Sequence, residues 1–270
     1  MDSQKESEII ETLAKNWNRS GLEKGDLVLV HSSLMKLIRT VKRKFNEMVT
    51  PQMVYDSLLM AIGKEGTLVL PLFNFDFGES KFFDIRETPS QMGALTEIGR
   101  KDPKAIRTGH PIYSFSVRGK LAHEFEGIDN KSGYGKDSPF AKLHELGGKI
   151  AVIGLKDRNS QTSAHYVEEQ MQVDFRYYKE FTGEYVDKDG NSSQKTYLLY
   201  VRDIENGVEQ TDNDNLMDFY WKEGGYKGDK WDEGYGMRTI KFDDLYRLTE
   251  RIINEGLAPT HLYRRVGAGG

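Results

Sequence analysis

The sequence predicts an α/β fold around one mixed sheet, mostly parallel in its N-terminal part and antiparallel in its C-terminal part. Three short apolar runs without alternation, at 27–31, 66–73 and 149–153, indicate strands buried on both faces. Segments with helical spacing separate them, which is the pattern of a parallel sheet with crossover helices. Two further strand-like stretches flank Asp189–Gly190, a dipeptide typical of a hairpin turn. No clear linker interrupts the chain, so we expect residues 1–270 to form a single domain.

The helices are predicted from apolar spacing and from their end signals. Apolar residues recur every three or four positions over 7–17, 138–146 and 243–254. The helix that begins at Thr50–Pro51 has a capping residue followed by a proline, and Gly63 ends it. Another helix follows Ser90 and contains Glu97. Such a helical glutamate is normally exposed and inert.

The C-terminal third changes in character. Residues 203–236 are rich in Asp, Glu, Asn and Gly, which predicts long loops with few regular elements. Upstream, 110–117 is predicted to be a loop that leads into a strand, and 121–125 a short helix. A closing strand is expected within 262–267.

Composition excludes several classes of protein. The chain has no cysteine, which rules out disulfides, thiolate catalysis and cysteine zinc sites. The net charge of −4 gives no basic footprint for nucleic acid. No apolar run reaches membrane-spanning length, and the N-terminus lacks the basic start and apolar stretch of a signal peptide. We therefore expect a cytoplasmic protein without nucleic-acid or membrane partners.

A polar loop after the strand at 149–153 is the first candidate site, because ligands of open α/β sheets bind beyond the carboxyl ends of strands. Thr162 and His165 are three residues apart. If a helix begins near Thr162, its hydroxyl and the imidazole of His165 lie on one face, one turn apart. Such a pair suits acid–base catalysis. A capped helix with an ordinary exposed histidine explains the same spacing.

Two other strand ends carry polar groups. The tripeptide His31-Ser32-Ser33 offers N–H and hydroxyl donors to a phosphate or a carbonyl, although a plain turn has the same composition. Lys36–Lys44 follows with five basic residues, either a solvated face or an anion clamp. Asn74–Phe77 mixes aromatic and polar groups suited to gripping an acceptor, or packs its aromatics as a loop.

Six short blocks in the same order resemble the aminoglycoside 3-N-acetyltransferase family, also called antibiotic N-acetyltransferases. The blocks, within residues 5–175, are Val28–Leu34, Gly66–Pro71, Ser90–Leu95, His110–Phe115, Gly135–Phe140, and Leu146–Ile150 running into Thr162–His165. Each block alone is weak evidence for the family, and the occurrence of all six in the same order makes the resemblance strong. The resemblance implies a mixed α/β domain, unrelated to the common acetyltransferase fold. It also implies direct transfer of an acyl group, usually acetyl, from acyl-coenzyme A to an amine without a metal.

The resemblance also assigns catalytic roles. His165 matches the histidine that removes a proton from the acceptor amine, and Thr162 matches the threonine that contacts the reacting thioester. Glu97 matches the glutamate that orients the histidine. The residue types suit this chemistry, because an amine needs a base before it can attack, and such a base contributes ~10²–10⁴-fold. A carboxylate behind the imidazole fixes its tautomer.

Binding roles follow in the same way. The expected coenzyme A contacts are the turn residues His31, Ser32, Ser33 and Leu34 and the strand residues Ser114, Phe115 and Ser116. The candidate acceptor contacts are Phe73, Asn74, Asp76 and His110.

The acceptor is predicted from the positions at which this sequence departs from the family pattern. Lys36–Lys44 replaces a glycine-rich turn found in many family members, and it suits an anionic acceptor. The sequence therefore slightly favours a nucleotide-linked amino sugar for surface polysaccharide. The alternative is an aminoglycoside held by acids within 203–244, as in antibiotic resistance. The basic run is also compatible with a contact to the coenzyme A 3′-phosphate alone.

Three competing readings are weaker. A metal hydrolase with His31, His110 and His165 as ligands lacks ligand spacing. A serine acyl-enzyme at Ser32 or Ser33 lacks the Gly-x-Ser-x-Gly elbow. A binding module without catalysis is disfavoured because Thr162, His165 and Glu97 are all present.

Overall fold

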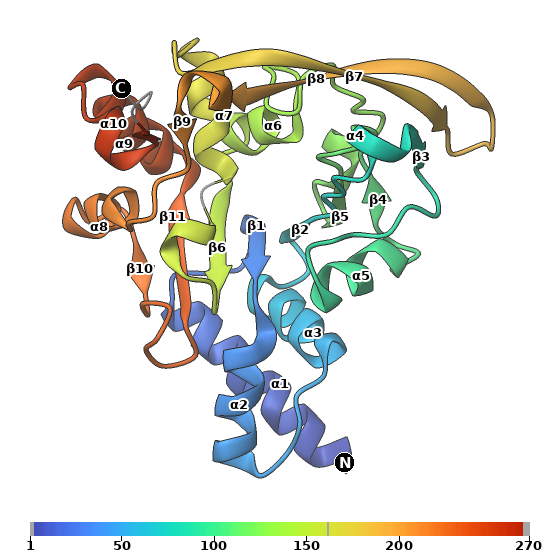
Figure 1. The fold of residues 1–270 in the computed structure, drawn as a ribbon. Helices are drawn as coiled ribbons and strands as arrows, with labels where there is room; N and C mark the ends of the chain where they lie inside the picture. The colour runs from blue at the N-terminus through green and yellow to red at the C-terminus, as the bar shows by residue number, and fades with distance from the viewer. Residues whose placement is uncertain (1–2, 161, 267–270) are drawn as a thin grey trace.

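A seven-stranded mixed sheet forms the centre of the protein, in the strand order β10-β11-β6-β1-β2-β5-β4 (Figure 1). The computed structural model describes residues 3–160 and 162–266. Three strands are parallel, β6 (Lys149–Ile153), β1 (Leu27–Ser32) and β2 (Thr67–Pro71). The antiparallel strands are β11 (Met237–Lys241), β10 (Lys227–Gly228), β5 (Phe115–Gly119) and β4 (Ile106–Arg107). The predicted α/β class is confirmed, and the parallel pairs of this central sheet are confined to the three predicted apolar runs.

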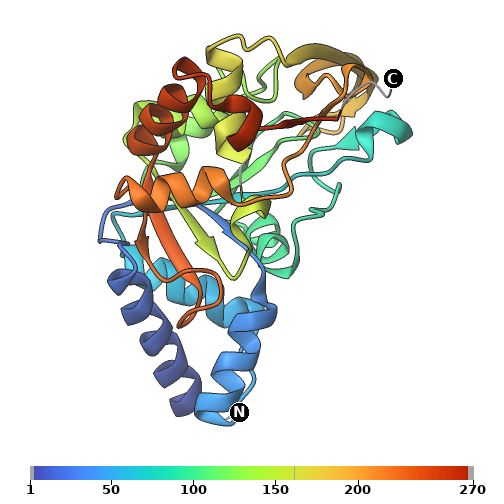
Figure 2. The ribbon, with the colours of Figure 1, turned by 60° about the vertical axis from the view of Figure 1, so that its left-hand side comes forward.

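One face of the sheet is covered by the N-terminal helices. They are α1 (Ser3–Arg19), α2 (Leu34–Phe45), α3 (Pro51–Ile62) and α5 (Ala94–Lys101). Because side chains alternate along a strand, Val28 and Val30 of β1 point to this layer and pack with Trp17 of α1. The Trp17 indole N–H donates to Ser57 Oγ at 2.8 Å inside the layer. Figure 2 shows α1 and α2 at one end of the molecule and α9 at the other.

The opposite face carries the later helices. They are α6 (Pro139–Glu145), α7 (Thr162–Gln170), α8 (Asn215–Lys222), α9 (Phe242–Asn254) and α10 (Ala258–His261). Leu27 and Leu29 of β1 pack in this second cluster. His31 shares their parity and therefore faces the layer that contains α7. Within 3–160 and 162–266, no helix is both long and apolar enough to cross a bilayer.

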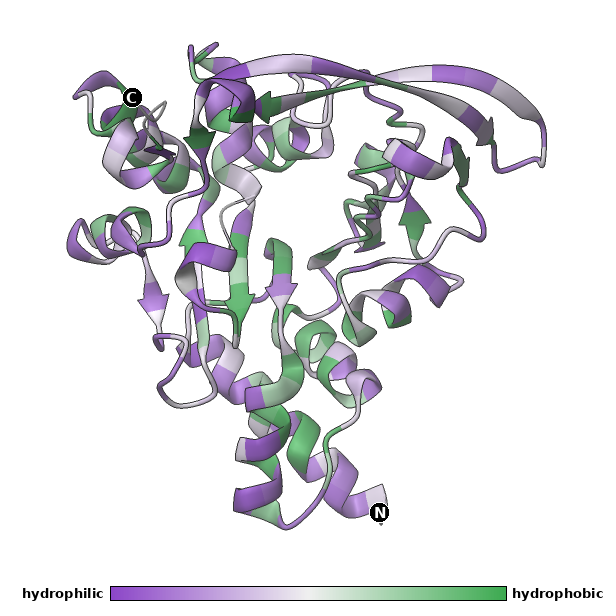
Figure 3. Ribbon diagram, viewed as in Figure 1, coloured by the Kyte–Doolittle hydropathy of each residue, from purple (hydrophilic) through white to green (hydrophobic). Residues whose placement is uncertain are grey.

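A long hairpin projects from the body as an arm (Figure 1). Its strands, β7 (Arg176–Val186) and β8 (Ser192–Arg202), pair over their whole length, and β3 (Phe82–Asp84) adds to β7. Much of the arm is coloured purple or pale in Figure 3, so it is more polar than the central strands. The predicted turn at Asp189–Gly190 is confirmed.

Short elements complete the described chain. They are α4 (Phe77–Ser80), η1 (Ala122–Phe125), η2 (Asp157–Asn159), η3 (Ile204–Asn206), β9 (Val208–Glu209) and β12 (Arg264–Arg265). The predicted closing strand is reduced to β12, which pairs with β9. Its predicted last residue, Gly267, lies outside the described residues.

Several elements were not predicted from the sequence pattern, and three of them contribute to the core or the sheet. The basic stretch 36–44 is part of α2, with Leu37 and Val41 buried beneath its cations. The region expected to be loops contains α8, because Leu216 and Tyr220 are buried within a polar stretch. β11 also went unpredicted, since Arg238 occupies the middle of this buried strand.

Candidate active site

The catalytic candidates stand at the start of α7, which begins at Thr162 as the spacing required. Thr162 and His165 therefore lie one turn apart on one helix face. The Nδ1 atom of His165 is 2.7 Å from Oε2 of Glu168. The His165 side chain keeps 18% of its surface exposed, whereas that of Glu168 keeps 1%. A reachable imidazole thus sits on a buried carboxylate.

Arg176, the first residue of β7, completes this cluster. Its Nε lies 2.7 Å from Oε2 of Glu168, and one terminal nitrogen lies 2.8 Å from Nδ1 of His165. The other terminal nitrogen donates to the Tyr200 carbonyl at 2.9 Å. The Nδ1 of His165 either donates to Glu168 or accepts from Arg176. Only the first arrangement leaves Nε2 with the lone pair that a base needs.

Burial sets the charge states in this cluster. It lowers the pKa of His165 to about 4, with Arg176 acting in the same direction and Glu168 opposing. The imidazole is therefore neutral near pH 7 and able to accept a proton. Burial alone raises the pKa of Glu168, but Arg176 and His165 outweigh it, and the net pKa is below the usual value. Glu168 is consequently a stable carboxylate.

A row of aromatic rings joins His165 to the end of β1. The ring centroids of His31 and Phe73 are 6.3 Å apart, and those of Phe73 and Tyr113 are 4.5 Å apart. Tyr113 and Tyr134 follow at 4.8 Å, and Tyr134 and His165 at 5.4 Å. The structure thus brings together three predicted residues, His31, Phe73 and His165, from β1, the end of β2 and α7.

His31 is a buried member of that row. Burial, with a smaller contribution from Arg238, lowers its pKa to about 4, so the ring is neutral. Among the described residues, its Nε2 has no hydrogen-bond partner. A buried polar atom without a partner is costly in a folded protein, which makes this nitrogen a candidate contact for a bound molecule.

A cavity of about 230 Å³ opens beside His165. Tyr113 and Tyr134 form part of its wall, and the two ends of the hairpin supply Arg176 and Arg202. The cavity therefore combines a neutral imidazole, two phenol rings and two guanidinium groups.

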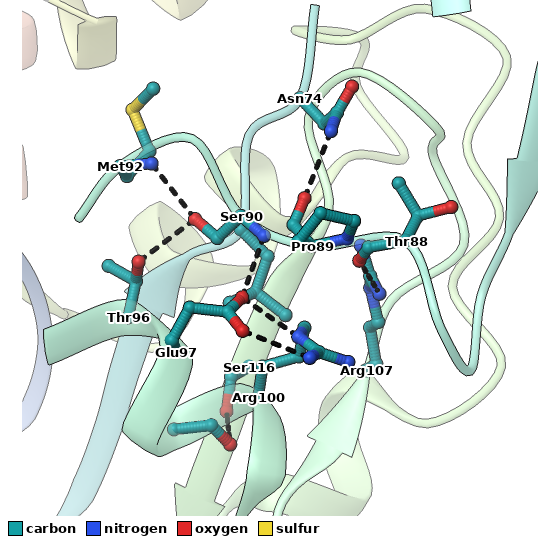
Figure 4. Close-up of polar contacts among 12 residues, drawn as sticks. Asn74, Thr88, Pro89, Ser90, Met92, Thr96, Glu97, Arg100, Arg107 and Ser116 are labelled. Carbon is teal, nitrogen blue, oxygen red and sulfur yellow. Dashed lines mark hydrogen bonds and ion pairs between the residues drawn. The ribbon is translucent and has the colours of Figure 1, made fainter. Parts of the chain in front are cut away.

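Glu97 does not occupy the predicted place beside His165. Its carboxylate accepts from the Ser90 N–H at 2.7 Å and from Arg100 at 2.8 and 2.9 Å (Figure 4). The reason is positional, because α5 packs in the layer opposite α7. The carboxylate in contact with His165 is Glu168, and the expected role of Glu97 in orienting the histidine stays a prediction.

The predicted coenzyme A strand is occupied by internal contacts. Ser114 accepts hydrogen bonds from Arg107, and Ser116 donates to the Gly99 carbonyl at 2.8 Å. Phe115 is fully buried against Phe73 and Phe140. These contacts do not favour the predicted role of the three side chains along a pantetheine arm.

The turn after β1 has one donor engaged and one without a cap bond, the N–H and the hydroxyl of Ser33 respectively. Ser33 is the N-cap of α2 without a side-chain cap bond, and its N–H donates to the Ile153 carbonyl at 2.8 Å. Ser32 and Leu34 flank it at the end of β1 and the start of α2. Gly154 approaches so closely that an added Cβ would lie 2.4 Å from the Ser33 carbonyl oxygen. Its φ of +63° also favours glycine. The ends of β1 and β6 therefore approach closely at this point.

The predicted acceptor contacts divide into buried and exposed groups. Asn74 is buried and donates to the Pro89 carbonyl (Figure 4), while exposed Asp76 accepts from Gln91. His110 is fully buried, and its Nδ1 accepts the N–H groups of Ile112 and Tyr113. His110 thereby fixes the loop that places Tyr113 in the aromatic row.

Sequence reasoning missed Glu168, Arg176, Arg202 and the two tyrosines of the row. Glu168 follows His165 by three residues, the same spacing that selected Thr162, so that rule also indicates Glu168. No group of three or more histidine and acidic side chains that could hold a metal occurs among residues 3–160 and 162–266.

Comparison with known proteins gives three consistent results. A sequence model described as aminoglycoside 3-N-acetyltransferase matches residues 29–224. The chain is 28% identical over 183 residues to the SPbeta prophage-derived aminoglycoside N(3')-acetyltransferase-like protein YokD of Bacillus subtilis (strain 168), covering 58% of this chain and 64% of that protein. It is 25% identical over 181 residues to aminoglycoside N(3)-acetyltransferase VIII of Streptomyces fradiae, covering 58% and 59%. These matches span about three fifths of each curated relative.

Solved structures show the same fold. Aminoglycoside acetyltransferase AAC(3)-Xa superposes with a TM-score of 0.75 at 21% identity, covering 94% of this chain and 98% of that one. AAC-IIIb in a binary complex with CoASH gives 0.74 at 18% identity, covering 92% and 96%.

Proposed function

The chain belongs to the aminoglycoside 3-N-acetyltransferase family, and on that premise we propose that it transfers an acyl group from coenzyme A to an amine of an aminoglycoside. The observation that carries the proposal is the contact of 2.7 Å between His165 Nδ1 and the buried Glu168 carboxylate. This pair presents a neutral imidazole, and the cavity lies beside it.

The acceptor is chosen over the nucleotide-linked amino sugar for two reasons. The relatives carry the names of aminoglycoside acetyltransferases. In addition, the basic stretch that favoured an anionic acceptor is partly engaged. Lys36 Nζ donates to the carbonyls of Trp231 and Glu233 at 2.9 and 2.7 Å, and Lys44 Nζ contacts the Tyr235 hydroxyl. Both lysines therefore fasten α2 to the loop before β11.

The proposed reaction uses His165 as general base. Nε2 takes a proton from the attacking amine while the amine nitrogen bonds to the thioester carbonyl carbon. When the carbon–sulfur bond breaks, the departing sulfur takes a proton and leaves as the free thiol. Glu168 stabilises the imidazolium that forms and holds the ring in the required tautomer. Thr162, one turn away on the same face, is the proposed donor to the developing oxyanion.

Acyl-coenzyme A is proposed to approach from the turn Ser32–Leu34. α2 has 12 residues, and the first N–H groups of such a helix attract phosphate. The uncapped Ser33 hydroxyl adds a donor. The orphaned Nε2 of His31 lies between this turn and the aromatic row that leads to His165.

A thiol-release assay with acetyl-coenzyme A tests the proposal. The acceptor panel contains aminoglycosides, free amino sugars and nucleotide-linked amino sugars. We expect an aminoglycoside to stimulate release, and His165→Ala to lower kcat by roughly 10²–10⁴-fold while the protein stays folded. The matched control is His123→Ala, because His123 is exposed on η1. Full activity of His165→Ala, or no release with any amine, would contradict the proposal.

A further inference from the structure

Two arginines at the base of the hairpin arm share the cavity beside His165. Arg176 begins β7 and Arg202 ends β8, and the two residues are directly opposite in the antiparallel register. Both line the cavity of about 230 Å³. Like charges directly opposite on paired strands are destabilising, so this arrangement requires a compensating negative charge.

The protein supplies that charge for one arginine only. Glu168 contacts Arg176, which also donates to the Tyr200 carbonyl. Across residues 3–160 and 162–266, no side-chain hydrogen bond or ion pair engages the guanidinium of Arg202, although its backbone pairs with that of Arg176. With His165 neutral, two guanidinium groups and one carboxylate leave one positive charge at the cavity.

The groups around Arg202 indicate which kind of partner its guanidinium lacks. The groups that act on it are Arg176, Glu168, Tyr134 and Tyr113, of which Glu168 alone is acidic. Burial and then Arg176 lower the pKa of Arg202, but a guanidinium stays protonated near neutral pH. A planar guanidinium with free N–H groups matches a carboxylate in two parallel hydrogen bonds.

We propose that Arg202 binds an anionic group, of carboxylate type, that one of the two reactants carries next to its reacting centre at His165. The phosphates of coenzyme A are not this group, because the pantetheine arm separates them from the thioester. The anion belongs either to the far end of the acyl chain, as in a succinyl or malonyl thioester, or to the acceptor beside its amine. Which reactant carries the anion depends on the proposed acyl transfer. Binding of an anion by Arg202 does not depend on that reaction.

Kinetic assays with combinations of acyl donors and acceptors distinguish an anion on the acyl chain from an anion on the acceptor. Wild type and Arg202→Gln are compared with acetyl- and succinyl-coenzyme A, each with acceptors that have or lack a carboxylate near the amine. We expect Arg202→Gln to raise KM for the anionic reactant by roughly 10- to 100-fold, as for a lost charged hydrogen-bonded pair. Neutral reactants are expected to lose far less, because Arg202 affects the pKa of His165 and of Glu168 less than Arg176 does.

Two control variants isolate the guanidinium. Lys179→Gln removes a cation from an exposed position of the same hairpin and is expected to leave all KM values unchanged. Arg202→Lys keeps the charge without the planar fork and is expected to restore part of the lost affinity. An equal loss for neutral and anionic reactants would assign Arg202 a merely structural role and overturn the proposal.

Anion binding is measured independently by isothermal titration calorimetry with succinate, and with uncharged succinamide as the reference. Saturable binding of succinate to wild type, lost in Arg202→Gln and weakened in Arg202→Lys, supports the inference. If Arg202→Gln does not fold, the wild-type and Arg202→Lys titrations carry the test. Absence of saturable binding to wild type, or equal binding by all variants, contradicts it. If no amine accepts an acyl group but succinate binds through Arg202, the proposed function fails while the anion site stands.

Discussion

Glu168 and Glu169 are adjacent on α7 and both buried, at 1% and 4% exposure, yet their surroundings are opposite. Glu168 meets Arg176 and His165. Glu169 accepts from the Ser132 hydroxyl at 2.7 Å and from the Tyr178 hydroxyl at 3.4 Å, and it forms no ion pair with any residue of 3–160 and 162–266. Consecutive helical residues point about 100° apart. Glu168 therefore contacts charged side chains, whereas Glu169 contacts hydroxyl groups.

The protonation of the two carboxylates follows this difference. Cations hold the pKa of Glu168 below its usual value, whereas burial raises the pKa of Glu169. The cavity beside His165 includes Leu199, and a second cavity of about 440 Å³ includes Glu169 and Leu198. Buried carboxylates on one helix therefore differ in the direction of their pKa shift according to whether a cation contacts them.

Glu168→Gln is expected to have the largest effect. It removes the charge that stabilises the imidazolium, so kcat should fall by roughly 10²–10⁴-fold. It also leaves Arg176 buried without a carboxylate, which costs ~3–5 kcal/mol of stability. Steady-state kinetics and urea unfolding measure the two effects. The neighbouring Glu169→Gln is the control, and similar results for both variants would abolish the distinction between the two sides of the helix.

Glu97→Gln tests whether the more distant carboxylate has any catalytic part. Its contacts with Arg100 and the Ser90 N–H are structural, so we expect a loss of ~1–2 kcal/mol in unfolding free energy. We expect kcat to stay within about twofold of wild type. A large drop in kcat without any loss of stability would show that Glu97 acts on His165 after all.

Glu169→Gln is expected to change stability in the opposite sense to Glu168→Gln. Because the folded pKa of Glu169 is raised above its unfolded value, the native state binds more protons above about pH 4.5. Its contribution to stability is therefore present at low pH and lost as pH rises through the folded pKa. The variant should gain up to ~1 kcal/mol over wild type at pH 8 relative to pH 5. Unfolding curves at both pH values measure this difference, and the reverse trend would contradict it.

The smallest expected effect is the response of kcat to mild acid. Since the folded pKa of His165 is about 4, the base stays neutral well below the usual histidine range. At saturating substrates, kcat should vary by less than about twofold between about pH 5.5 and 7. A decline centred near 6.5 would show that the imidazole near Glu168 titrates as an exposed histidine does.

The sequence was informative where burial is uniform. The cores of β1, β2 and β6 are continuous apolar runs, and α3 has both its cap and its proline. It was uninformative where buried residues are polar or charged. Arg238 and Thr239 are buried in β11, so this strand does not appear as an apolar run. Tertiary packing, rather than local pattern, decides such segments.

The candidate site also has residues that local sequence indicates and residues that only the tertiary structure brings together. The Thr162–His165 pair is visible because helical spacing is a local property. Arg176 and Arg202 are 26 residues apart and meet only through the register of the hairpin. The turn of a hairpin fixes its register, but it does not show that the two strands extend as far as Arg176 and Arg202. The assignment of Glu97 came from resemblance, whereas the contact of Glu168 with His165 is seen only in the structure.

The antiparallel strand β11 has a consequence for synthesis of the chain on the ribosome. It covers the outer edge of β6, the strand that leads to α7. Its Thr239 hydroxyl donates to the Ser20 carbonyl, a contact between residues 219 positions apart. Until residues 237–241 have been translated, β6 presents an unpaired edge that invites pairing with other chains. The strand that precedes α7 is thus paired on both edges only when nearly the whole polypeptide exists, and we expect a nascent or truncated chain that ends before β11 to be prone to aggregate.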